Sequence, residues 1–166
     1  RLFAFEHYGI VPDILCLAKS LGGGMPLGAF MSSKEIMKSL TFDPPLGHIT
    51  TFAGHPVSCA AGLAAQNFIL KQDLVSVSHE MGQYYRDLLD HPSIDSIRGK
   101  GLFLAVVLKE GYSVDHFIKS AFEEGLIIDK FLFCDNAFRI APPLVISKEE
   151  LEESVRKVLK TIELIS

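Results

Sequence analysis

The sequence has few cysteines, no apolar run of membrane-spanning length and no cluster of basic residues. Its three cysteines, Cys16, Cys59 and Cys134, are odd in number and widely spaced, which fits neither a disulfide framework nor a zinc site. Because their neighbours are apolar, we expect inert core thiols in a reducing compartment. No apolar stretch reaches the ~18 residues that a membrane span needs, and the formal net charge is -4. We therefore expect a cytoplasmic protein that binds neither membranes nor nucleic acid.

The composition is that of an ordinary globular protein, with 48% hydrophobic and 22% charged residues. A chain of this length can bury roughly 70% of its unfolded surface, enough for one or two hydrophobic cores. The six histidines form no pair at the spacing of metal ligands on a helix or strand, so we expect no metal site.

The most informative residue present is Lys19, which lies between an apolar run and a glycine-rich stretch. Residues 14–18 predict a buried strand, and residues 20–28 predict a turn at which backbones approach closely. A desolvated lysine loses its proton more readily, and enzymes that form Schiff bases use such a setting to obtain a nucleophilic amine. From these residues alone, the simpler alternative is a strand-end lysine whose ammonium group reaches solvent.

The glycines beside Lys19 do not form a nucleotide-binding motif. In a P-loop the glycines precede the Lys-Ser/Thr pair, whereas Gly22, Gly23 and Gly24 follow Lys19 and Ser20. The spacing of these glycines does not match a dinucleotide-binding fingerprint either.

Several segments, taken together, resemble the class III aminotransferases, the ornithine and acetylornithine type that uses pyridoxal phosphate. Residues 12–29 resemble the segment that carries the cofactor lysine, and residues 1–9 resemble the stretch before it. Residues 50–56 resemble the turn that contacts the cofactor phosphate, usually Ser-Thr-aromatic-Gly-Gly-Asn-Pro. Residues 98–102 and 139–144 resemble two signatures of the small domain. The resemblance covers the whole chain, in the family's order.

The resemblance implies an α/β fold, made of the second part of the large domain of a pyridoxal-phosphate-dependent transferase and a C-terminal small α/β domain. We expect residues 1–72 to be an incomplete remainder of the large domain, 73–90 a linking helix and 91–166 the small domain. The chain opens with arginine inside a family segment, so we expect a fragment of a longer polypeptide, inactive when isolated. The family's glycine-rich phosphate cradle and the partners of the cofactor ring would then lie upstream.

Local patterns predict the elements themselves. Strands are expected at residues 14–18, 27–31, 94–97, 102–108, 126–128 and 138–141, and the turn between the middle pair at residues 98–101. Helices are expected after the capping residues Ser33, Ser113 and Ser147, and at 56–70 and 73–88. Ser147 and Glu150 predict a capping box, and the apolar stripe of the last helix is expected at Leu151, Val155, Val158 and Ile162. Helix 56–70 is apolar or small nearly all round, which predicts burial. Short strands that alternate with helices predict a layered α/β domain.

The resemblance also assigns roles to individual residues. Lys19 would hold pyridoxal phosphate as a Schiff base and then act as the general base between the substrate Cα and the cofactor C4′. Thr51, with Thr50 beside it, would contact the cofactor phosphate of the neighbouring subunit in a homodimer. Without the resemblance, an ordinary turn before a helix is the simpler interpretation of the two threonines. Arg139 would bind a substrate carboxylate or, alternatively, form a structural ion pair.

The function implied is transamination in amino acid metabolism. An amino group would move from an amino acid or ω-amine to a 2-oxo acid. Two alternatives stay open: an aminomutase, decarboxylase or racemase of the same fold, and an inactive fragment that serves only as a dimerisation module.

Overall fold

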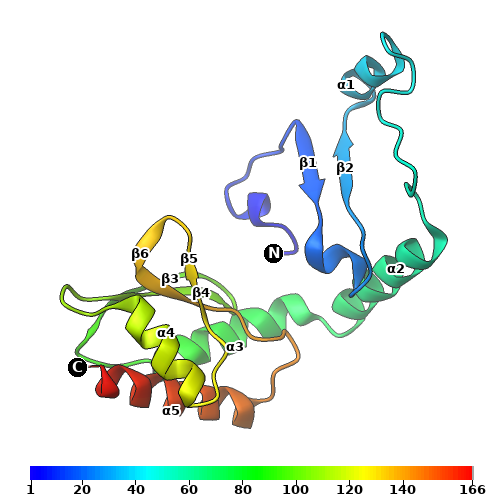
Figure 1. Ribbon diagram of the computed structural model, residues 1–166. Coiled ribbons are helices and arrows are strands. Elements are labelled where there is room, and N and C mark those ends of the chain that lie inside the picture. Colours follow the sequence, from blue (N-terminus) through cyan, green and yellow to red (C-terminus); the bar gives the residue numbers. More distant parts are fainter. Residues whose placement is uncertain (166) are drawn as a thin grey trace. The chain divides into compact units, whose positions relative to one another are not determined.

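The computed structural model describes residues 1–165, and the contacts divide the chain into two compact units with the boundary between Val75 and Ser76 (Figure 1). We call these unit 1, Arg1–Val75, and unit 2, which starts at Ser76.

Unit 1 contains a small antiparallel ladder and several helices. Strands β1 (Ile14–Leu17) and β2 (Ala29–Ser32) pair in antiparallel fashion, with Cys16 opposite Phe30. The remaining elements are three short 3-10 helices and two α-helices: η1 (Ala4–His7), η2 (Lys19–Gly22), η3 (Ser39–Thr41), α1 (Lys34–Lys38) and α2 (Pro56–Lys71). The expected strands and helices of this part are confirmed to within two residues. Ser33 caps α1 as predicted, because its Oγ accepts a hydrogen bond from the Ile36 N–H at 3.3 Å.

Small residues let the glycine-rich turn pack closely on helix α2. Gly23 has a left-handed backbone (φ 57), and a Cβ there would lie 3.0 Å from the carbonyl oxygen of Ala61. A Cβ on Gly62 would lie 2.9 Å from the carbonyl oxygen of Leu21. The predicted close approach of backbones after Lys19 is therefore confirmed.

The predicted burial of β1 and α2 is wrong. Ile14 is 51% exposed and Leu63 on α2 is 64% exposed. Strand β1 has only β2 as a neighbour, and a two-stranded ladder leaves its faces open unless another layer covers them. The prediction of buried core thiols is also wrong, since Cys16 and Cys59 are exposed and Cys134 is half-buried.

Unit 2 is a four-stranded antiparallel sheet with helices on one face. Its elements are α3 (Leu74–Leu88, of which the first two residues belong to unit 1), β3 (Ile94–Lys100), β4 (Phe103–Leu108), α4 (Val114–Glu123), β5 (Asp129–Phe131), β6 (Cys134–Ile140) and α5 (Lys148–Leu164). The strand order is β3-β4-β6-β5. Alternate residues of β4 and β6 enter the core together with apolar residues of the three helices. Phe117 of α4 stacks on Phe138 of β6, with ring centroids 4.0 Å apart. The predicted layered α/β domain is confirmed.

Local end signals of unit 2 were predicted well. Ser113 caps α4, and Gly125 follows its end with φ 78. Ser147 and Glu150 form the predicted capping box of α5. All four predicted stripe residues of α5 are buried: Leu151, Val155, Val158 and Ile162.

Several predicted strand boundaries are wrong. Residues 98–100 belong to β3, so the turn to β4 is shorter than expected and holds Gly101 and Leu102. The predicted strand at residues 126–128 is wrong, because these residues form no strand and β5 begins after them, at Asp129. Strand β6 begins at Cys134 and not at residue 138. Polar residues extend these ladders, because backbone pairing does not require an apolar side chain.

Helix α3 had been expected to link two domains across residues 73–90. In the structure its Tyr85 is 1% exposed and lies in the core cluster of unit 2, together with the following Leu89.

Among residues 1–165, no helix is long and apolar enough to cross a membrane.

Candidate functional site

Lys19 is the first residue of η2, and one residue, Ala18, separates it from the end of β1. Its backbone is left-handed, with φ 55, a region that non-glycine residues seldom occupy and that costs about 1–3 kcal/mol. The turn is closed by hydrogen bonds from the Leu21 N–H to the Ala18 carbonyl (3.1 Å) and from the Gly23 N–H to the Ser20 carbonyl (3.0 Å). Strained backbone of this kind is concentrated at functional sites.

The lysine side chain is exposed, so the prediction of a desolvated amine is wrong for this chain. The cause is the open face of the ladder: β1 has only β2 as a neighbour in its sheet, and it ends beside solvent. The amine is therefore accessible, but the described residues do not exclude water from it.

Thr50 and Thr51 lie in an exposed turn before helix α2. The Thr50 carbonyl accepts a hydrogen bond from the Ala53 N–H at 3.3 Å, and Gly54 supplies a left-handed residue (φ 66). No side chain caps the first turn of α2, which starts at Pro56. Pro56 has no N–H, and the Cys59 N–H donates to the His55 carbonyl at 3.0 Å, so Val57 and Ser58 carry the N–H groups of this turn that no side chain caps. In the described part of the chain, no hydrogen bond joins either threonine to Lys19.

Arg139 on β6 forms an ion pair with Asp129, the residue directly opposite it on β5. The Arg139 guanidinium donates to Asp129 Oδ2 at 2.7 Å, and the two side chains are 36% and 67% exposed. An exposed pair of this kind contributes about 1 kcal/mol at most. The pair matches the predicted structural alternative for Arg139, and its role toward a substrate stays a prediction.

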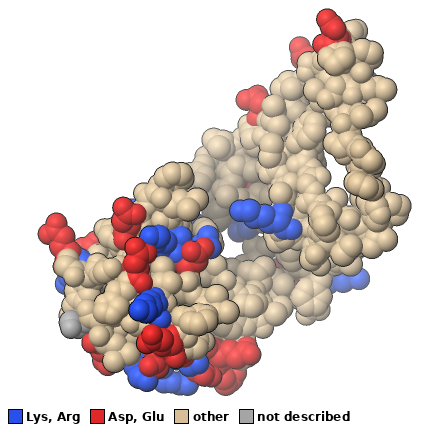
Figure 2. Space-filling model, in the orientation of Figure 1, with Lys and Arg blue, Asp and Glu red and all other residues tan. Residues whose placement is uncertain are grey.

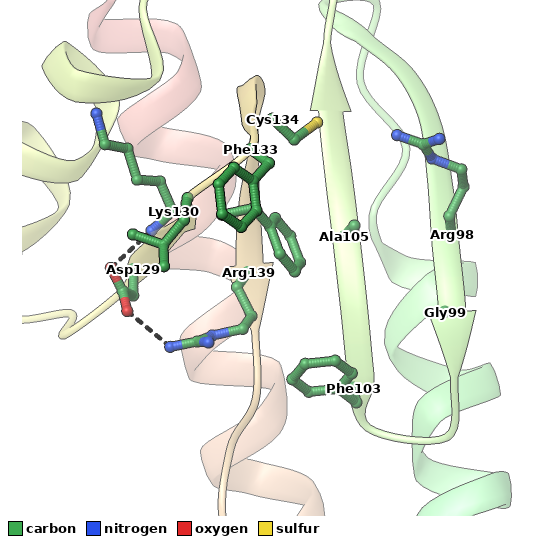
Figure 3. A pocket seen from close by; sticks show the side chains of 11 residues that line it. Arg98, Gly99, Phe103, Ala105, Asp129, Lys130, Phe133, Cys134 and Arg139 are labelled. Atoms are coloured by element: carbon green, nitrogen blue, oxygen red, sulfur yellow. Dashed lines mark hydrogen bonds and ion pairs between the residues drawn. The ribbon is translucent and has the colours of Figure 1, made fainter. Parts of the chain in front are cut away.

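Arg139 also lines a hollow of about 820 Å³ on the sheet face that points away from the helices (Figure 3). The hollow is lined by residues of all four strands and of the β5–β6 turn: Arg98, Gly99, Phe103, Ala105, Asp129, Lys130, Phe131, Leu132, Phe133, Cys134 and Arg139. Lys130 forms an ion pair with Asp115 at 2.7 Å. That hydrogen bond and the Asp115 charge raise the pKa of Lys130. The face shown in Figure 2 intersperses acidic and basic side chains over unit 2.

Helix α3 contacts the β3–β4 hairpin through three residues, Ser78, Gly82 and Arg86, each four positions after the one before. Ser78 Oγ accepts the Leu102 N–H at 3.2 Å. Arg86 donates to the carbonyls of Ile97 and Gly99, each at 2.8 Å. Gly82 lies between them, and a Cβ there would meet the carbonyl oxygen of Gly101 at 2.1 Å.

We did not predict this contact from the sequence. The available signal is Gly82 itself, because an isolated glycine inside a helical pattern usually has a packing reason.

Among the residues that the structure describes, no group of His, Cys, Asp and Glu is arranged to hold a metal ion.

Comparison with known proteins identifies the family to which the chain belongs. The sequence profile of the class-III aminotransferases matches residues 1–162. The chain therefore belongs to the class-III aminotransferase family, whose members depend on pyridoxal phosphate. The resemblance noted in the sequence is confirmed.

Ornithine and acetylornithine aminotransferases are among the relatives that match. The chain is 40% identical over 162 residues to ornithine aminotransferase 2 of Staphylococcus aureus. The matched region covers 95% of this chain and 39% of the relative. It is 37% identical over 163 residues to the acetylornithine aminotransferase of Caldanaerobacter subterraneus subsp. tengcongensis, covering 94% and 39%.

A solved structure shows the same fold over nearly the whole chain. The ornithine aminotransferase of Toxoplasma gondii, crystallised in the presence of oxidised glutathione with partial occupancy of pyridoxal phosphate at its active site, superposes with a TM-score of 0.85. The match has 30% sequence identity and covers 99% of this chain and 39% of that one. The chain thus spans about two fifths of the length of the relatives it matches.

Proposed function

We propose that this chain is part of a transaminase that uses pyridoxal phosphate bound to Lys19. The observation that carries the proposal is the placement of Lys19 at the end of a strand, on a strained backbone, before a glycine turn that packs on α2. The family match over residues 1–162 supports it.

The residues present fit the cofactor. The Lys19 amine is accessible for a covalent bond to an aldehyde. The turn at Thr50 and Thr51 offers two hydroxyl groups beside the uncapped first turn of a 16-residue helix. Such a helix end carries a partial positive charge and free N–H groups, which favour a phosphate.

When bound, pyridoxal phosphate supplies an electron sink for the reaction. The chain's own residues would position it and move the proton. Lys19 Nζ would hold the cofactor and, once released by the substrate amine, would take a proton from the substrate Cα as a neutral base. Since the described residues leave Lys19 in solvent, further protein must exclude water from it during turnover.

We propose that Thr51 contacts the cofactor of a second subunit, so that the site is complete only in a homodimer. The lack of any hydrogen bond between Thr51 and Lys19 among the described residues is consistent with this arrangement. The exposed apolar side chains of α2, such as Val57 (57%) and Leu63 (64%), also need a covering surface.

A cytoplasmic location is part of the proposal, since the three cysteines are all free.

We propose an amino acid or ω-amine as the amino donor and a 2-oxo acid as the acceptor, because the relatives at 40% and 37% identity are an ornithine and an acetylornithine aminotransferase. Arg139 would bind a substrate carboxylate in exchange for Asp129. The exchange is feasible because the existing ion pair is exposed and weak.

The exposure of Lys19 favours one alternative, an inactive module that acts only by association. An aminomutase or decarboxylase of the same fold is the other alternative, and measuring the products of the reaction separates it from a transaminase.

The first test uses the chain as it is. Incubation with pyridoxal phosphate, reduction with borohydride and peptide mass spectrometry should place the adduct on Lys19 in preference to Lys38, which is also exposed. Equal labelling of both lysines would contradict a special role for Lys19.

The second test restores the missing length. In a chimera, residues 1–162 replace the matching segment of the Staphylococcus aureus relative, and glutamate formation from 2-oxoglutarate and ornithine is measured. We expect Lys19→Ala to abolish turnover and the matched Lys38→Ala variant to retain it. An active chimera that tolerates Lys19→Ala would refute the proposal.

A further inference from the structure

A row of paired residues crosses the sheet of unit 2 and forms part of the floor of the hollow. Arg98 of β3 lies opposite Ala105 of β4, Ala105 lies opposite Arg139 of β6, and Arg139 lies opposite Asp129 of β5. All four residues line the hollow (Figure 3). Since neighbouring strands are about 4.8 Å apart, the backbone of β3 lies about 10 Å from that of β6 along this row. The shape of the hollow on this side therefore depends on where β3 is held.

The β3 end of this row has few restraints of its own. Strand β3 is at the edge of the sheet and, in the described part of the chain, pairs only with β4. Sheet hydrogen bonds therefore hold it on one side. Two glycines with positive φ, Gly99 (130) and Gly101 (53), follow Arg98. Because glycine restricts the backbone least of all residues, the pairing with β4 alone does not fix the end of this hairpin.

Arg86 supplies a restraint from helix α3. Its guanidinium donates from Nη1 to the Ile97 carbonyl and from Nη2 to the Gly99 carbonyl, each at 2.8 Å. These residues are the two neighbours of Arg98, so the planar fork of the guanidinium holds the backbone of Arg98 from both sides. The helix is itself anchored, because the adjacent Tyr85 is 1% exposed and belongs to the core cluster. Contacts thus run from the core of unit 2 through Arg86 to the wall of the hollow.

We propose that Arg86 is a positioning residue of the substrate site. It is not among the described residues that line the hollow, and it acts through β3, by keeping Arg98 and Gly99 in register with Arg139. The proposal rests on the proposed function, in which Arg139 binds a substrate. Lys19 belongs to unit 1 and the lining of the hollow to unit 2. Loss of Arg86 should therefore weaken substrate binding and spare proton transfer, so that KM rises while kcat stays the same.

Steady-state kinetics of the Staphylococcus aureus chimera test this role. We measure kcat and the KM for 2-oxoglutarate in the parent, Arg86→Gln and Arg86→Lys. Arg86→Gln loses the forked contact, which should raise KM about fivefold, the effect of about one lost hydrogen bond. Its kcat should change by less than about twofold. Arg86→Lys keeps a cation that can donate to one carbonyl at a time, so its KM should lie between those of the parent and Arg86→Gln.

A destabilised variant with an intact hairpin is the matched control. Ser147→Ala removes the capping box of α5, which lowers stability but leaves the contacts of β3 in place. Its KM should equal that of the parent. In the chain itself, NMR-detected amide hydrogen exchange at Arg98 and Gly99 should be faster in Arg86→Gln and unchanged in Ser147→Ala. Hydrogen exchange needs no turnover, so it measures the anchoring of β3 separately from activity.

Three results would overturn the proposal. The first is a KM of Arg86→Gln equal to that of the parent. The second is an equal rise of KM in Ser147→Ala, because loss of stability alone would then account for the effect. The third is unchanged amide exchange in Arg86→Gln. None of these results bears on Lys19, whose role is tested by the turnover of Lys19→Ala. Conversely, a chimera that tolerates Lys19→Ala refutes the transaminase proposal and leaves the anchoring of β3 standing.

Discussion

Replacing Gly82 with alanine sets two physical effects of opposite sign against each other. In an exposed helix interior, glycine to alanine stabilises by about 1 kcal/mol. Here, however, the added Cβ would lie 2.1 Å from the carbonyl oxygen of Gly101. This is well inside the closest approach of real atoms, and the obstacle is backbone, which cannot rotate away. Helix α3 and the β3–β4 hairpin must therefore separate.

The cost of that separation follows from the contacts it disturbs. Overpacking costs about 1–3 kcal/mol. The shift also weakens the hydrogen bond from the Leu102 N–H to Ser78 Oγ and the two from Arg86 to the carbonyls of Ile97 and Gly99, which together contribute about 1–2 kcal/mol. After the gain in helix propensity is taken into account, we expect a net loss of about 2 kcal/mol in the free energy of unfolding.

Urea unfolding followed by circular dichroism measures this loss, and thermal unfolding should show a midpoint about 10 °C lower. Glu80→Ala, on the same helix at an exposed position, is the matched control and should change the free energy of unfolding by less than about 0.5 kcal/mol. A Gly82→Ala variant as stable as the parent, or more stable, would show that the close contact with the hairpin does not control stability.

Three further predictions concern unit 2. The pKa of Lys130 is raised by Asp115, so this contribution to stability is complete below the unfolded value of about 10.4 and is lost as pH rises through the folded pKa. The unfolding midpoints of parent and Asp115→Asn should therefore converge at high pH, and a constant difference would contradict the prediction. The hydrogen bond to Glu152 raises the pKa of Tyr84, so Tyr84→Phe should remove a tyrosine that ionises above about pH 10 from an ultraviolet titration; loss of one that ionises normally would refute it. Ser147→Ala removes the capping box of α5 and should cost about 1 kcal/mol in urea unfolding, and an unchanged midpoint would show that the cap is dispensable.

Local chemistry explains which parts of the fold the sequence predicted. Ser33, Ser113 and Ser147 each cap the helix expected after them, because a cap is made within four residues of chain. The buried stripe of α5 follows in the same way from its spacing. Burial of α2 could not be predicted correctly, since an apolar helix is buried only where another surface covers it, and Leu63 remains 64% exposed.

In the candidate site, too, features made by contiguous residues could be predicted from the sequence, and features that depend on strand pairing could not. Lys19 and the glycine turn could be located from sequence, because strand, lysine and turn are contiguous. The partner of Arg139 could not, because Asp129 is opposite it only through the β5–β6 register, and β5 begins three residues later than expected. The hollow was missed for the same reason: it joins Arg98 on β3 to the β5–β6 turn, which only the sheet brings together.

The two hydrogen bonds that Arg86 makes to β3 also affect how copies of the chain meet. Strand β3 lies at an edge of the sheet, where unpaired backbone carbonyls invite a strand from another molecule and start aggregation. Arg86 already occupies the carbonyls of Ile97 and Gly99, so a foreign strand would have to displace a guanidinium. The Arg86 side chain of helix α3 thus hinders the addition of a further strand at the β3 edge of the sheet.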